Sequence, residues 1–309
     1  MRQKALPTAN WVPVKGLWEL KNGEAVYKSP QRNGEDPYGI VLSKIELKQG
    51  NVRANVTLGE DLEAARIMLG YSPLPGRYIT VGLGGYGRAY CISEYSPGVG
   101  WIARQLAGDS SNLQAQREYA LGVGIKGQRV LLSVDGIPVL EDVLDEPLSG
   151  QQVGLFAWGK GEAKFSNVKA TSDPATAFVV IQLSDPYFDL YGGVIKPIAE
   201  SMGLNCYLAS EIYGPGSILQ DIVQSIVESA VVIAEITPPN PNVFYEVGYA
   251  HALKKPTILL ADRNTKLPFD VSGYRCIFYE DKIRGKPEVE ANLQRHLEAV
   301  LRGQKGPVA

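Results

Sequence analysis

The feature that most constrains the fold is the uneven distribution of glycine along the 309-residue chain. Residues 1–174 hold 23 of the 33 glycines, and the other 10 follow. Frequent glycine between short apolar runs is typical of a chain with many tight turns. The first half is therefore expected to form short strands joined by turns, and the second half a different architecture.

Apolar and polar residues alternate in the first half with the period of two that a half-buried strand requires. Val52–Leu58 shows this most clearly, and Arg129–Leu140 predicts two strands joined by a turn at Asp135-Gly136. An Asp-Gly pair supplies the positive φ angles of a tight hairpin. Since no segment here has a long helical period, about ten to twelve strands are expected, packed as an antiparallel β-sandwich.

Three motifs late in the first half resemble the closing strands of concanavalin-like (laminin-G-like) jelly rolls. They are Val134-Asp135-Gly136, Gly154-Leu155 and Phe165-Ser166-Asn167-Val168. The resemblance covers about residues 17–170 and implies a jelly-roll domain over residues 1–172, acting as a sensor or partner-binding domain for a glycan or a protein. No strand carries the close carboxylate pair of a glycosidase, so sugar hydrolysis is not expected there.

Gly82–Gly87 fits the G-x-G-x-x-G pattern of dinucleotide-binding loops. That pattern binds a pyrophosphate only where a helix opens at its third glycine. Arg88–Ser93 has the composition of a strand and no helical face. The glycines are therefore predicted to form a turn between two strands.

Composition excludes several classes of function. The three cysteines, Cys91, Cys206 and Cys276, are scattered, and His251 and His296 are the only histidines, so neither a disulfide framework nor a metal site is expected. A net charge of −2 provides no bulk attraction to nucleic acid or to a membrane surface. No apolar run is long enough to span a bilayer, and the N-terminus lacks the core of a signal peptide, so a cytoplasmic protein is expected.

The second half alternates short, continuously apolar runs with amphipathic segments, which predicts a parallel sheet covered by helices on both faces. This domain is expected over residues 175–309, with strands at 177–181, 206–208, 231–234, 257–261 and 274–279 and helices at 189–202, 217–230, 243–253 and 289–301. Ligands of such sheets bind at the carboxyl ends of the strands, so the loops that follow them are the candidate site.

Those loops contain polar and aromatic residues suited to binding a small ligand. Asn242 is expected to cap a helix whose positive end favours an ionised Glu246. Tyr245 and Tyr249, one helical turn apart, would wall the pocket. Ordinary capping and packing explain the same spacing equally well. The full set of predicted binding residues is Ser184, Asp185, Tyr187, Glu211, Asn240, Asn242, Tyr245, Tyr249, Phe269 and Asp270.

Residues 240–253, with the sequence NPNVFYEVGYAHAL, resemble the TIR-like and nucleoside 2-deoxyribosyltransferase-like superfamily. The resemblance covers about residues 177–281 and implies a flavodoxin-like domain with Glu246 as the catalytic carboxylate. It also implies cleavage of the N-glycosidic bond of NAD, with NAD as substrate, no bound cofactor, and activation by homo-oligomeric assembly in prokaryotic antiviral defence. Two positions depart from the pattern, Gln182-Leu183-Ser184 after the first strand and Glu235 where many relatives carry aspartate.

Three alternatives to NAD cleavage stay open at this point. The second half could be a nucleoside or nucleotide glycosidase or a base-transfer enzyme. It could also be a non-catalytic nucleotide sensor or an assembly scaffold. Recognition of a glycan or a foreign protein by the sandwich could be the main function instead. His251 lies about 140° round the helix from Glu246, so it is expected to be structural or interfacial.

Overall fold

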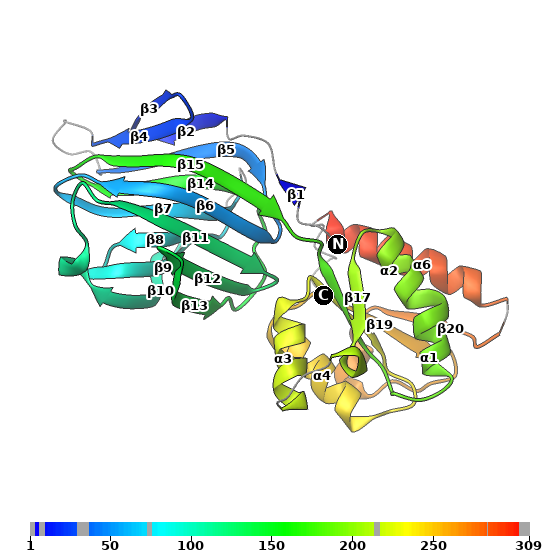
Figure 1. Ribbon diagram of the computed structural model, residues 1–309. Helices are drawn as coiled ribbons and strands as arrows, with labels where there is room; N and C mark the ends of the chain where they lie inside the picture. Colours follow the sequence, from blue (N-terminus) through cyan, green and yellow to red (C-terminus); the bar gives the residue numbers. More distant parts are fainter. Residues whose placement is uncertain are drawn as a thin grey trace. The chain divides into compact units, whose positions relative to one another are not determined.

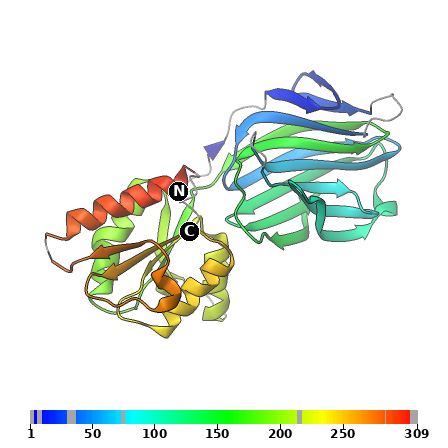
Figure 2. The same cartoon turned by 180° about the vertical axis from the view of Figure 1, so that it is seen from behind.

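The computed structural model describes residues 4–5, 10–29, 37–72, 76–212, 217–282 and 284–302. The chain divides into two compact units, coloured blue to green and green to red in Figure 1 and seen from behind in Figure 2. The first unit comprises Met1–Leu144 and Leu148–Asp173, and the second comprises Asp145–Pro147 and Pro174–Ala309. No helix within the described ranges is long and apolar enough to cross a membrane.

The first unit consists of two antiparallel sheets. Its strands are β1 (Lys4–Ala5), β2 (Trp11–Lys15), β3 (Leu17–Lys21), β4 (Glu24–Lys28), β5 (Tyr38–Glu46), β6 (Gly50–Leu58), β7 (Leu62–Tyr71), β8 (Tyr78–Gly84), β9 (Arg88–Ser96), β10 (Gly100–Asp109), β11 (Glu118–Lys126), β12 (Arg129–Val134), β13 (Ile137–Val143), β14 (Gln152–Gly159) and β15 (Ala163–Ser172). Sheet A has the order β13-β12-β11-β6-β15-β4-β3, with β1 paired to β15, and sheet B has the order β10-β9-β8-β7-β14-β5-β2. The predicted β-sandwich with a jelly-roll architecture is confirmed.

The main core of this unit fills the space between the two sheets. Alternation places every second residue of β6 in it, so Val52, Ala54 and Val56 are buried while their neighbours are not. Strands β7 and β8 of sheet B behave differently, because they are buried on both faces along most of their length. Sheet B therefore carries apolar side chains on its outer face as well.

Two predictions about turns in this unit are confirmed. Asp135 and Gly136 join β12 to β13 with φ angles of 51° and 82°. Gly82–Gly87 ends β8 and turns into β9, and no helix follows it. The glycine pattern is thus part of a hairpin and not a dinucleotide-binding loop.

The second unit is a five-stranded parallel sheet, sheet C, with helices on both faces. Its strands are β16 (Thr176–Val180), β17 (Asn205–Leu208), β18 (Val231–Glu235), β19 (Thr257–Asp262) and β20 (Cys276–Tyr279), in the order β17-β16-β18-β19-β20. Its helices are α1 (Tyr187–Leu190), α2 (Lys196–Ser201), α3 (Ile218–Glu228), α4 (Pro241–Ala252), α5 (Phe269–Ser272) and α6 (Lys286–Leu301).

Separate apolar clusters fill the space on the two faces of sheet C. Ala199 of α2 and Leu293 of α6 belong to one cluster, and Ile226 of α3 and Val247 of α4 belong to the other. The predicted helix over residues 189–202 is interrupted, since a π-helical turn at Tyr191–Ile195 separates α1 from α2. Two consecutive glycines, Gly192 and Gly193, lie in that turn, and glycine weakens a helix interior.

Candidate functional site

Two of the predicted loops, those after β16 and β18, are hydrogen-bonded to each other at the carboxyl ends of the strands of sheet C. Asn240, after β18, donates from Nδ2 to Oε1 of Gln182, after β16, at 3.4 Å. Gln182 also donates from Nε2 to the hydroxyl of Ser184 at 3.0 Å. Connections leave β16 and β18 in opposite directions along the sheet, and ligands of parallel sheets bind where this reversal occurs.

Helix α4 begins earlier than the sequence suggested. Asn240, rather than Asn242, is the N-cap, and its Oδ1 accepts from the backbone N–H of Asn242 at 2.9 Å. Pro241 follows at the first helical position, where its missing N–H is not needed. The expectation that Asn242 caps the helix is therefore wrong, and Glu246 lies in the second turn of α4.

Glu246 is a half-buried carboxylate without a hydrogen bond or ion pair to any other described residue. Burial raises its pKa from 4.5 to about 7. Such a carboxylate exchanges a proton near neutral pH, which is typical of functional sites but also occurs in structural ones. His251, on the same helix, stacks on Tyr274 with 4.1 Å between the ring centroids.

The remaining predicted residues differ widely in their surroundings. Phe269 is 92% exposed and Tyr245 54% exposed, whereas Tyr187 and Tyr249 are half-buried. Glu211 accepts hydrogen bonds from the Tyr191 hydroxyl, Lys196 Nζ and the backbone N–H of Leu208. The other side chains, Asp185, Asn242 and Asp270, are exposed. Among the described residues of this set, only Ser184 and Asn240 are linked by hydrogen bonds, through Gln182, so the assignment of the set as one site stays a prediction.

Glu235 at the end of β18 is a second perturbed carboxylate in this unit. It is 1% exposed and accepts from the backbone N–H of Thr237 at 2.9 Å and the hydroxyl of Tyr279 at 3.0 Å. Burial raises its pKa to about 7, against the opposing effect of these two bonds. The partnership with Tyr279 was missed from the sequence because that residue lies two strands away in sheet C.

The outer face of sheet B carries an aromatic cluster that the sequence analysis did not identify. Its rings come from six strands: Tyr38 of β5, Tyr71 of β7, Tyr78 of β8, Tyr95 of β9, Trp101 of β10 and Phe156 of β14. Tyr78 and Phe156 are buried, and the other four rings are partly exposed. We call these six residues the aromatic face.

Trp101 connects the two ends of the aromatic face. The centroid of its ring lies 5.0 Å from that of Phe156, 5.7 Å from Tyr78 and 5.5 Å from Tyr95. Tyr38 continues the row at 6.1 Å from Phe156. A sheet face turned away from the sandwich core is normally polar, so a continuous row of rings there marks a surface with a role beyond closing the core.

A fully buried arginine lies next to the aromatic face. Arg66 of β7 donates to Gly84 O, the Thr80 hydroxyl and the Ser93 hydroxyl, and its guanidinium carbon lies 5.9 Å from the Phe156 centroid. Burial lowers its pKa, and its hydrogen-bond acceptors among the described residues are carbonyl and hydroxyl oxygens. These bonds fix the sheet beneath the rings.

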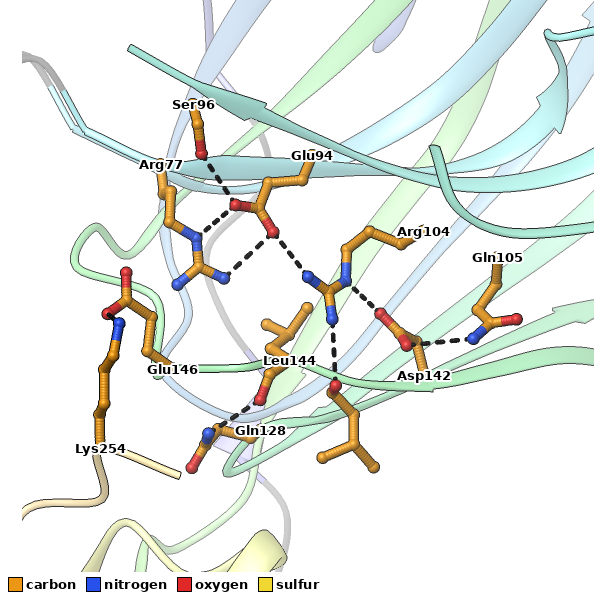
Figure 3. Close-up of polar contacts among 11 residues, drawn as sticks. Arg77, Glu94, Ser96, Arg104, Gln105, Gln128, Asp142, Leu144, Glu146 and Lys254 are labelled. Carbon is orange, nitrogen blue, oxygen red and sulfur yellow. Dashed lines mark hydrogen bonds and ion pairs between the residues drawn. The ribbon is translucent and has the colours of Figure 1, made fainter. Parts of the chain in front are cut away.

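Figure 3 shows the ion-pair ladder that anchors β9 and β10, the edge of sheet B that carries Tyr95 and Trp101. Glu94 accepts from Arg77 Nε at 2.6 Å and from Arg104 Nη1 at 3.0 Å, and Arg104 continues to Asp142 of sheet A. Arg104 is the extra residue of a β-bulge between Ala103 and Gln105. Burial acts to raise the pKa of Glu94, but the bonds from Arg77 and Ser96 hold it below its usual value.

A pocket of about 370 Å³ opens at the Gly84–Gly87 turn. Tyr86 and the exposed carboxylates of Glu60, Asp61 and Glu63 line it. Over the ranges that the structure describes, no three His, Cys, Asp or Glu side chains are grouped so as to hold a metal ion.

Comparison with known proteins places part of this architecture among characterised folds. No family model matches the chain. A carbohydrate-binding module of Bacillus subtilis is 17% identical over 52% of this chain and 94% of its own, with a TM-score of 0.44. A β-glucanase of Bacillus licheniformis is 13% identical over 55% of this chain and 98% of its own, with a TM-score of 0.41. Both cover about half of the chain, and such concanavalin-like jelly rolls are the expected class for the first unit.

One curated protein is similar in sequence. It is the zeaxanthin 7,8(7',8')-cleavage dioxygenase of Crocus sativus, 29% identical over 230 residues, which are 68% of this chain. The chain spans about half the length of this relative, 54%. Its identity and coverage are too low to assign the chain to a family.

These comparisons contradict the predicted function. The curated relative is named a zeaxanthin-cleavage dioxygenase and not an NAD hydrolase, so the prediction of NAD hydrolysis by a TIR-like effector is wrong. Nothing in them supports a nucleosidase, an antiviral role or a TIR-like second unit. Two of the three named proteins are enzymes, which is compatible with an enzyme only in general terms.

Proposed function

We propose that the first unit is a carbohydrate-binding module and that the aromatic face of sheet B is its binding surface. The observation that carries the proposal is the row of partly exposed rings linked by Trp101 on the side of the sheet turned away from the main core. The ligand is a glycan, which the sequence analysis named as one candidate ligand of this domain.

Sugar rings suit such a surface because each presents a face of C–H groups beside its hydroxyls. Aromatic rings pack against apolar surface and keep a polar edge available, and tyrosine and tryptophan do both. The row in sheet B offers four tyrosines and one tryptophan with successive centroids 5.0–6.1 Å apart. A short oligosaccharide laid along it would contact several rings at once.

The buried groups below the rings support a preformed site. Arg66 is held by three protein acceptors, and the ion-pair ladder holds β10 against β9 and sheet A. Rings supported in this way lose little freedom when a ligand binds, and preorganisation of this kind raises affinity.

Binding of oligosaccharides to the full chain, measured by calorimetry after a glycan-array screen, tests the proposal. Trp101→Ala is expected to abolish binding because it removes the ring that links the two ends of the row. Phe269→Ala is the control, since that ring is 92% exposed and lies in the second unit. If no glycan binds, or if Trp101→Ala binds as well as the parent, the carbohydrate assignment fails.

We also infer that the second unit is flavodoxin-like. Counted from its first strand, sheet C has the order 2-1-3-4-5, which is the flavodoxin-like order of doubly wound sheets. The bridge from Asn240 to Gln182 lies at the reversal of that order, and Glu246 follows on α4. These features support a ligand site at this edge of sheet C, with Glu246 as its acidic group.

A further inference from the structure

Tyr78 is the least exposed tyrosine of the aromatic face, and its hydroxyl lacks a protein partner. The residue is 8% exposed, and no other described residue forms a hydrogen bond with it. The hydroxyl oxygen itself is still accessible to solvent. Buried hydroxyls are normally hydrogen-bonded within the protein, so this one keeps its hydrogen-bonding capacity for water or for a ligand.

Three other phenols surround Tyr78. The ring centroids of Tyr71 and Tyr95 lie 5.8 Å and 5.1 Å from its own. Burial raises the pKa of Tyr78, and the nearby hydroxyls of Tyr38, Tyr95 and Tyr71 raise it further. Tyr78 therefore lies beside two other phenols of the aromatic face, and it stays uncharged at neutral pH. Each can donate one hydrogen bond and accept others.

The charged groups near this cluster are already engaged. Arg66 is enclosed by its acceptors on β8 and β9, and Arg77 pairs with Glu94. Lys15 of β2 lies with its Nζ 3.8 Å from the centroid of the Tyr38 ring. Apart from the exposed Lys15, the polar groups that the aromatic face offers a ligand are uncharged: the phenol hydroxyls and the indole N–H of Trp101.

We propose that the aromatic face selects an uncharged oligosaccharide, whose hydroxyl groups complete the hydrogen bonds of Tyr78 and the three phenols around it. This rests on the proposed carbohydrate-binding function and adds the class of sugar. Hydroxyls of a neutral sugar match groups that both donate and accept, whereas a carboxylate or an ammonium would require a compensating charge. Affinity should therefore be insensitive to salt and to pH from mildly acidic to mildly alkaline conditions.

Three hexasaccharides of different charge test the proposal on the full chain: a neutral glucan, a polyuronate and a chitosan fragment. The parent protein is expected to bind the neutral chain with the same Kd at low and high salt. Tyr78→Phe keeps the ring and removes the hydroxyl, and it should raise that Kd about tenfold, the equivalent of one lost hydrogen bond. Tyr27→Phe is the matched control, because the Tyr27 hydroxyl lies in the main core and donates to Gly159 O.

The outcomes separate this inference from the function on which it rests. Tighter, salt-dependent binding of the polyuronate or the chitosan fragment overturns the choice of an uncharged ligand. Equal binding by the parent and Tyr78→Phe, with binding still lost in Trp101→Ala, overturns the role of the phenols and leaves the binding module intact. Failure of all three saccharides, and of the wider array, overturns both.

Discussion

Replacing Glu246 by glutamine should stabilise the second unit at alkaline pH and leave it unchanged in acid. Burial raises the pKa of this carboxyl group to about 7 in the folded protein, and no described residue compensates its charge. The folded state therefore binds the proton more tightly than the unfolded state does. Glutamine resembles the protonated form, so the substitution removes the penalty for burying the ionised form.

The magnitude follows from the distance between the two pKa values. The pKa rises from 4.5 to about 7, and at about 1.36 kcal/mol for each pH unit the penalty comes to slightly more than about 3 kcal/mol. Because the folded pKa is the higher one, stability is greatest below about pH 4.5, falls through the interval, and is lowest above about pH 7. Solvent reaches this half-buried side chain, so about 3 kcal/mol is an upper bound.

Hydrogen exchange of slowly exchanging amides in β18 and α4 measures the free energy of opening of this unit. The parent and Glu246→Gln should agree at about pH 4 and differ by about 2–3 kcal/mol at about pH 8. Glu200→Gln provides the control, since Glu200 is an exposed residue of α2 and should give no pH-dependent difference.

Two outcomes for Glu246→Gln would contradict this prediction. If Glu246→Gln shows the same stability as the parent at both pH values, the carboxylate is well solvated and its environment is ordinary. If the substitution destabilises the unit at alkaline pH, the ionised group has a favourable partner, and Glu246 is then a structural residue. Either finding would remove the main support for an acidic ligand site at this edge of sheet C.

Three further substitutions test the supports of the two units. Glu94→Gln should lower the free energy of unfolding of the sandwich by about 3 kcal/mol in urea titrations, because it leaves buried arginines short of a counter-charge; no loss would mean that the ladder is not structural. Asn240→Ala should cost about 1 kcal/mol through loss of the N-cap, and an unchanged α4 in hydrogen exchange would contradict this. Gly85→Ala should destabilise the sandwich more than Gly87→Ala in thermal unfolding. Both glycines have positive φ, but only at Gly85 would a Cβ lie 1.7 Å from Nη2 of Arg66.

The sequence predicted the architecture where periodicity and burial agree. Strand β6 alternates because one of its faces is buried, and β16 and β18 are continuously apolar because sheet C is covered on both faces. Strand β10 is hard to recognise from the sequence, because its bulge at Arg104 interrupts the alternation of apolar and polar residues. The face of the sheet to which each β10 side chain points follows from the register with β9, which the sequence does not give.

The predicted function failed for a different physical reason. Asn240-Pro241 followed by a helix is an effective start signal for any helix, since it caps the first turn and needs no N–H at the first position. The motif that supported NAD cleavage begins with these two residues, and its Val243, Val247 and Ala250 are buried in the core. Capping and packing therefore explain much of the motif without any ligand, and the comparison with the curated relative contradicts the functional interpretation.

The aromatic face could not be predicted, because its six rings come from six strands that are brought together only by sheet B. Alternation shows that a residue faces one side of a strand, but not which neighbours share that side. Strands β7 and β8 are buried on both faces, and their nearly continuous apolar sequence predicts a sheet that is covered on both sides. Such a prediction gives no sign of the partly exposed rings on the neighbouring strands.

A face that served only to cover sheet B would be more stable with phenylalanine in place of Tyr78. Its hydroxyl contributes no protein hydrogen bond while lying in a residue that is 8% exposed. An unsatisfied buried hydroxyl costs about 1–3 kcal/mol, and water reaching this one offsets part of that cost, so Tyr78→Phe should unfold at a slightly higher urea concentration than the parent. The same substitution should weaken glycan binding. A gain in stability together with a loss of affinity is the pattern of a binding residue, whereas a loss of stability with unchanged affinity would mean that the hydroxyl belongs to the packing of the sandwich.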